Sequence, residues 1–174
     1  FMEVLISGYG IKNTIGRYKI SDETHKLNEL IDNYTIENSS YLCIYKDLLF
    51  AISEINNAAK VYMFKQVKDE YKLIDSADVS GDILCHISYL PKNKVLIGSC
   101  YGDGRIFSIG ADDNGFTEVK SKIKLESNMD GRSRVHCAVS DKNEENLFIT
   151  NIATDRVYMC SITEGKLQIK SYLQ

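Results

Sequence analysis

The chain has 174 residues, of which 44% are hydrophobic and 26% are charged, and it carries a formal net charge of −3. This composition is ordinary for a folded domain and excludes collagen, a coiled coil and wholesale disorder. A slightly acidic chain has no electrostatic reason to bind nucleic acid or an anionic membrane, so we expect neither as a partner.

The compartment follows from what the sequence lacks. No apolar run approaches the ~20 residues that a membrane-spanning helix needs, and the opening FMEVLISG has no charged front of a signal peptide. The five cysteines are an odd number without C-x-x-C spacing, and four lie inside expected strands. We interpret them as reduced, small core residues, and we expect a cytoplasmic protein with no cofactor.

Short strands are the only elements that the pattern predicts. The first unit, over residues 1–34, is expected to have three strands and to lack an innermost one. The second unit, over residues 40–78, is expected to have four, and the polar turn Lys68-Asp69-Glu70 joins its last two. No segment shows a confident helical period, and Pro91 is the only proline.

The third unit, over residues 84–124, shows the pattern most clearly. Its stretch CHISYLPKNKVLIGSCYGDGRIFSI reads as a short strand, a turn, an alternating strand, a Tyr-Gly-Asp-Gly turn and another strand. An Asp-Gly pair between two apolar runs is a strong hairpin signal. The outer turn Asp112-Asp113-Asn114-Gly115 lacks the spacing of a calcium loop, so we interpret it as a hairpin tip.

A fourth unit, over residues 134–174, repeats the order of elements. The residues that end the second strand of each unit, Gly8, Ser53, Cys100 and Asn151, recur at intervals of 45, 47 and 51 residues. A period of this size, with about four short strands per repeat, is typical of a β-propeller. The sequence therefore predicts an all-β propeller segment of about three and a half blades, with the inner strands at 41–45, 85–90 and 135–140 buried on both faces.

The third unit resembles the second-blade signature of the bacterial 6-phosphogluconolactonases of the seven-bladed propeller type. Further support comes from Asn38-Ser-Ser-Tyr-Leu, from Ser53-Glu54, and from the segment between His136 and Asp155-Arg156-Val157. The resemblance covers nearly the whole chain but about half of a family-length protein. It implies hydrolysis of a sugar lactone by the full-length parent, and the substrate that we expect is 6-phosphogluconolactone of the pentose phosphate pathway.

Two histidines are the first candidates for catalysis. His86 and His136 open the inner strands of adjacent units, at places that the sequence makes equivalent, so we expect them near each other at one mouth of the channel. Lactone hydrolysis needs a base near neutral pH, for which imidazole is suited. The resemblance favours His136 as base or oxyanion partner, His86 as its neighbour and Glu54 as an orienting acid.

Substrate contacts are expected from other residues on the same rim. Arg132 and Arg134 offer a fork for a phosphate, although the family usually has histidine where Arg134 stands. Tyr101 and Asn151 take related positions in the last two units and are candidates to line the pocket. A zinc site built from Cys85, His86, His136 and Cys137 is disfavoured, because neighbouring strand residues point to opposite faces unless a bulge intervenes.

Two other interpretations remain open at this stage. The chain is also compatible with a non-catalytic propeller module that binds a protein or small ligand, or with an inactive fragment. Half a ring would expose two apolar faces, so we expect a second copy or the missing half to cover them.

Overall fold

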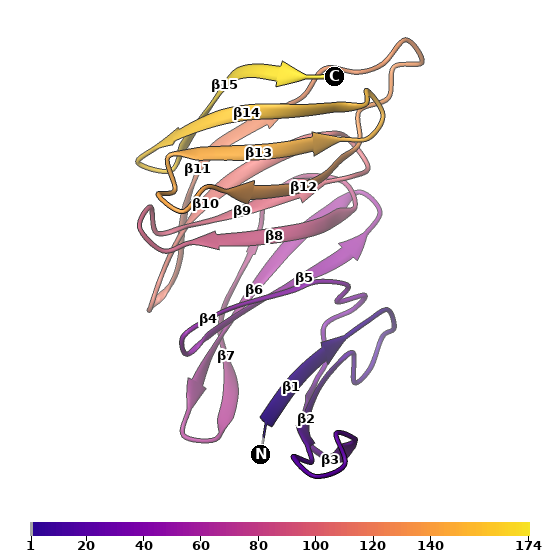
Figure 1. The fold of residues 1–174 in the computed structure, drawn as a ribbon, viewed down its shortest axis with the longest axis vertical. Coiled ribbons are helices and arrows are strands. Elements are labelled where there is room, and N and C mark those ends of the chain that lie inside the picture. Colours follow the sequence, from indigo (N-terminus) through magenta and orange to yellow (C-terminus); the bar gives the residue numbers. More distant parts are fainter. Residues whose placement is uncertain (1) are drawn as a thin grey trace.

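The computed structural model describes residues 2–174, and within that range every regular element is a β-strand. The strands form four antiparallel sheets that follow one another in chain order (Figure 1). The predicted hairpin at Tyr-Gly-Asp-Gly is confirmed, because Cys100 and Arg105 pair across that turn. The all-β propeller fold predicted from the repeat is therefore confirmed.

Each sheet is an up-and-down meander of consecutive strands. The first sheet has three strands, β1 (Met2–Ser7), β2 (Ile15–Ile20) and β3 (Leu27–Tyr34). The second has four, β4 (Leu42–Tyr45), β5 (Leu48–Ile55), β6 (Ala58–Val67) and β7 (Glu70–Asp78). The third contains β8 (Leu84–Leu90), β9 (Val95–Cys100), β10 (Arg105–Asp112) and β11 (Gly115–Lys124). The fourth contains β12 (Val135–Ser140), β13 (Asn146–Asn151), β14 (Arg156–Thr163) and β15 (Lys166–Leu173).

The core lies between neighbouring sheets, which pack face to face as propeller blades. Phe50 and Ile52 of β5 lie in one buried cluster with Leu96 and Phe107 of the third sheet. A second cluster joins the third and fourth sheets, and a smaller one joins the first and second. Every blade is therefore held by the apolar surface that it buries against its neighbour.

Close packing between blades depends on one glycine in β9. A Cβ built on Gly98 would lie 2.1 Å from the Cζ atom of Phe107, the residue opposite it on β10. The fully buried ring of Phe107 thus lies across the bare backbone of Gly98. A side chain at this position would displace the ring from the core between the second and third blades.

The prediction that all inner strands are buried on both faces is wrong for β4 and β12. Ile44 is 52% exposed and Val139 is 50% exposed. Ile44 borders a shallow groove beside Val4 and Leu5, at the side where the first sheet has no fourth, inner strand. Val139 lies on the face of the last sheet that no other described sheet covers. Of the three inner strands β4, β8 and β12, only β8, with a four-stranded blade on each side, has no exposed residue.

The uncovered face of the last sheet is apolar. Successive side chains along its strands point to opposite faces of the sheet. Leu147 and Ile149 therefore point into the core shared with the third blade, while Phe148 points away from it. The exposed apolar residues on this face include Val139, Phe148, Val157 and Met159. We call this set the open face.

Candidate functional site

The pairing register shows which residues of the inner strands are equivalent. Ile87 pairs with Gly98, two residues before Cys100, and Ala138 pairs with Ile149, two residues before Asn151. Both inner strands contain a bulge just before these pairs, at Cys85 in β8 and at His136 in β12. A bulge inserts one unpaired residue and re-aims its side chain.

The two histidines are therefore not equivalent, and that part of the sequence interpretation is wrong. His86 corresponds to Cys137, and the bulge residue His136 corresponds to Cys85. The sequence shows Cys-His in one blade and His-Cys in the next, and a comparison by residue type alone shifts the register by one. The position equivalent to His86 in the second blade is Tyr41. In that blade Leu42 pairs with Ala51, which lies two residues before Ser53, so Leu42 corresponds to Ile87 and the residue before it corresponds to His86.

The first row of equivalent residues runs across three blades as Tyr41, His86 and Cys137. The rings of Tyr41 and His86 are 4.5 Å apart at their centroids. On the other side, Nε2 of His86 lies 3.5 Å from Sγ of Cys137. His86 is 8% exposed and its Nδ1 has no hydrogen-bond partner. Its imidazole is therefore held between an aromatic ring and a thiol.

Burial sets the protonation state of His86. Desolvation, with a smaller contribution from the charge of His136, lowers the pKa of His86 from 6.5 to about 4. The imidazole is therefore neutral at physiological pH and can accept a proton.

The second row contains the bulge residues and the residues that directly follow Ser53 and Cys100, namely Glu54 and Tyr101. His136 is exposed, and its ring meets that of Tyr101 edge-on at 6.1 Å. The guanidinium of Arg134 lies 5.0 Å from the centre of the same Tyr101 ring, and its Nη1 donates hydrogen bonds to the carbonyl oxygens of Tyr101 and Gly102. Tyr101 thus connects the imidazole with the guanidinium.

Glu54 occupies the same kind of position one blade earlier. Its Oε2 accepts a hydrogen bond from the hydroxyl of Tyr9 at 3.0 Å and another from the hydroxyl of Ser40. Its charge also contributes to the raised pKa of the Cys85 thiol, about 12, which is caused mainly by burial. Ser40 and Tyr9 are contacts of Glu54 that the sequence interpretation missed.

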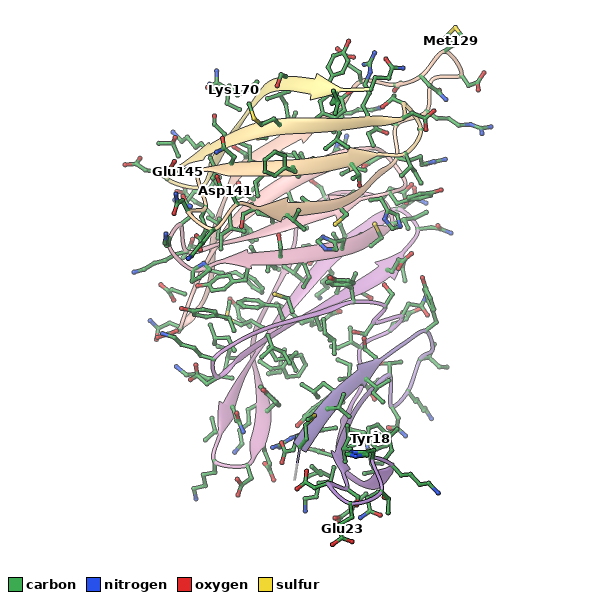
Figure 2. The ribbon with its side chains drawn as sticks, viewed as in Figure 1. Tyr18, Glu23, Met129, Asp141, Glu145 and Lys170 are labelled. Carbon is green, nitrogen blue, oxygen red and sulfur yellow. The ribbon has the colours of Figure 1, made fainter. Side chains whose placement is uncertain are left out.

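The loop between β11 and β12 carries the two candidate phosphate-binding arginines. Figure 2 shows its tip, at Met129, reaching beyond the sheets on the side opposite Asp141 and Glu145. Arg132 is exposed, and it lines a cavity of about 230 Å³ together with Arg134, Lys124 and Asp103.

Asn151 is wholly buried and is used by the protein itself. Its Oδ1 accepts hydrogen bonds from the backbone N–H of Arg134 and of Ala153, and its Nδ2 donates to Oγ of Ser133 and to the carbonyl of Glu126. The side chain thus fastens the loop that carries the arginines, and no polar atom of its amide is left for a ligand in this arrangement. Its predicted role in substrate binding stays a prediction.

No group of three or more side chains within residues 2–174 is arranged to hold a metal ion. The bulges at Cys85 and His136 do re-aim the side chains considered for a zinc site. Sγ of Cys85, however, lies within hydrogen-bond reach of the backbone carbonyls of Ser99 and His136. The same range contains no helix that would cross a bilayer, and all five cysteines in it are free.

Four consecutive antiparallel blades with a polar rim define this chain as a segment of a β-propeller. Residues 3–174 match the family model described as lactonase, 7-bladed β-propeller, and the chain belongs to this family. An uncharacterized protein of Staphylococcus epidermidis is 28% identical over 93% of this chain, which spans 49% of that relative.

Solved structures of two bacterial proteins share the fold. One is a putative 6-phosphogluconolactonase from Bacteroides fragilis, with a TM-score of 0.81 and 19% identity over 93% of this chain and 48% of that one. The other is the periplasmic gluconolactonase of Pseudomonas aeruginosa, with a TM-score of 0.86 and 17% identity over 95% of this chain and 52% of that one. The chain therefore spans about half the length of the proteins it matches.

The buried neutral state of His86 predicts a dependence of stability on pH. Its pKa is lower in the folded chain, about 4, than its ordinary value of 6.5, so between these values the unfolded chain binds more protons. This contribution to the free energy of unfolding is complete above about pH 6.5 and is lost as the pH falls toward 4, by about 3 kcal/mol in total.

Urea denaturation at a series of pH values measures this loss. His86→Phe keeps an aromatic ring against Tyr41 and is expected to flatten the slope between pH 6.5 and 4, whereas the control His136→Phe, at an exposed position, keeps it. A His86→Phe profile parallel to that of the wild type would contradict the assignment.

Proposed function

We propose that the full-length protein hydrolyses a sugar lactone at this rim. The observation that carries the proposal is the convergence of two imidazoles, a carboxylate and a guanidinium from neighbouring blades, in a chain of the lactonase family. Ring opening of a lactone adds water to an acyl carbon, so it requires a group that takes a proton and donors for the developing oxyanion.

His136 has the position expected of a base. It stands on a bulge of the inner strand β12, is exposed to solvent, and packs against Tyr101. His86 lies deeper and neutral beside it. Arg134, whose guanidinium is fixed by the carbonyls of Tyr101 and Gly102, supplies positive charge near the acyl oxygen.

A phosphorylated substrate is our proposal for the particular lactone. The cavity beside the rim brings together the cationic side chains of Lys124, Arg132 and Arg134 and one carboxylate, Asp103. Asp103 is already paired with Arg105, at 2.5 Å. The remaining positive charge suits the phosphate of 6-phosphogluconolactone, whose hydrolysis belongs to the pentose phosphate pathway, and the free cysteines support a cytoplasmic location.

The alternatives are a non-catalytic propeller module that binds a partner, or an inactive fragment. The open face favours the binding module. Val139, Phe148, Val157 and Met159 present apolar surface that is costly to leave in water. We propose that a second copy, or a further part of the protein, packs on this face. Either occupant is compatible with the lactonase proposal.

Substitution of the proposed base tests the activity. His136→Ala in the full protein is expected to lower kcat for lactone opening at least about 100-fold, since general base catalysis is worth that much, while the urea midpoint stays near that of the wild type. The measurement is acid release from gluconolactone and 6-phosphogluconolactone above the spontaneous rate. His25→Ala, at an exposed turn position, is the control, and equal turnover in His136→Ala would favour the binding module.

The phosphate preference is tested at Arg132, whose side chain is exposed and whose loss leaves the core intact. Arg132→Ala is expected to lower kcat/KM for 6-phosphogluconolactone about tenfold, because one charged hydrogen bond to phosphate is lost, and to leave that for gluconolactone unchanged. Lys142→Ala is a matched exposed control. A parallel loss on both substrates would argue against a phosphate site here.

Sedimentation of residues 1–174 tests the open face. We expect self-association that is abolished by Phe148→Asp, because a carboxylate cannot be buried there without a partner. Lys170→Asp, at an exposed position on β15 of the same sheet, is the control for added negative charge. A stable wild-type monomer at all concentrations would contradict a second copy as occupant.

A further inference from the structure

The thiol of Cys137 differs from the others in its surroundings. Its Sγ lies 3.5 Å from Nε2 of His86, and the residue is half-buried near the start of β12. The remaining thiols are packed into the cores between blades or lie against backbone carbonyls, namely Cys43, Cys85, Cys100 and Cys160. Among the described cysteines, Cys137 is thus the one whose sulfur contacts an imidazole.

His86 is arranged to serve this thiol. The residue is 8% exposed, its ring is fixed by Tyr41, and its Nε2 is directed at the sulfur of Cys137. Nδ1 is buried without a partner, which is costly in a structure where nearly all buried polar atoms are bonded. A buried base beside a more exposed thiol is the arrangement of a nucleophile and its activating group.

We propose that Cys137 is the nucleophile of the lactone reaction, with His86 as its base and His136 acting on water in a second step. The proposal rests on the proposed function. It assigns separate steps to the two imidazoles, which the bulges place in different rows.

The first step forms a thioester. Sγ of Cys137 attacks the carbonyl carbon of the lactone while its proton passes to Nε2 of His86. The ring C–O bond then breaks, and the ring oxygen takes that proton to become a hydroxyl group. In the second step His136 removes a proton from water, the hydroxide attacks the thioester, the C–S bond breaks, and the proton returns to the sulfur. The products are the free acid and the thiol.

The surroundings require that a base take the proton during the attack. Burial raises the pKa of the Cys137 thiol, so it is protonated at rest. The titratable groups near the pair are His136 on β12, Cys85 on β8 and Tyr41 before β4, and the charge of His136 lowers the pKa of His86. None is an acid that would hold an imidazolium at His86, so the imidazole stays neutral and available.

Mass spectrometry of the intact protein and of its proteolytic peptides tests the thioester. His136→Ala, mixed with gluconolactone and quenched in acid, is expected to gain the mass of one lactone on the peptide that contains Cys137. His136→Ala combined with Cys137→Ser gains none. Cys137→Ser alone is expected to lose turnover at least about 100-fold, and Cys43→Ser, a thiol outside the pair, keeps the wild-type rate.

These outcomes separate the two proposals. Wild-type turnover in Cys137→Ser, without an adduct in His136→Ala, would overturn the nucleophile and leave the lactonase function standing. A wild-type protein that opens no lactone would overturn both.

Alkylation by iodoacetamide provides a readout that does not depend on activity. Labelling of Cys137 at about pH 7.5 is expected to be slower in His86→Phe than in the wild type, and the rates should converge near pH 10, where the thiolate forms without a base. Equal rates at the lower pH would show that His86 does not serve the thiol.

Discussion

The face-to-face packing of neighbouring blades is the constraint on which the rest of the structure depends. Phe50, Leu96 and Phe107 are buried between the second and third blades, and Leu147 and Ile149 are buried between the third and fourth. Because these side chains interdigitate, one blade cannot slide or rotate against the next without opening a cavity. The packing therefore fixes the spacing of the inner strands, and with it the distance between equivalent residues at their ends.

The same packing determines the chemistry of the rim. His86 is neutral because the second and fourth blades cover it with Tyr41 and Cys137, and the resulting desolvation lowers its pKa. His136, one blade further and on a bulge, remains in contact with solvent. Two imidazoles on adjacent strands thus have different environments, and such pairs are suited to different steps of one reaction.

The sequence was sufficient for the fold and insufficient for the register of the site. The repeat of Ser53, Cys100 and Asn151 and the Asp-Gly turn before Arg105 follow from local pattern, so the blades could be predicted. The bulges could not, because each directly follows the first residue of a short strand, where too few residues precede it to show a break in hydrophobic alternation. The contact of Cys137 with His86, and the use of Asn151 to hold the arginine loop, arise between blades and were missed for that reason.

Strand β12 connects the candidate site with the open face. Its first residues carry His136 and Cys137, and two residues further Val139 projects from the uncovered side of the same strand. An occupant that buries Val139 and Phe148 would restrict the motion of β12, and the Sγ to Nε2 distance depends on how firmly that strand is held against β8. Coverage of the open face and precision of the rim would thus be coupled through one short strand. In the proposed mechanism, a partner that contacts no substrate would still influence catalysis, because it would fix the Cys137 thiol against its base.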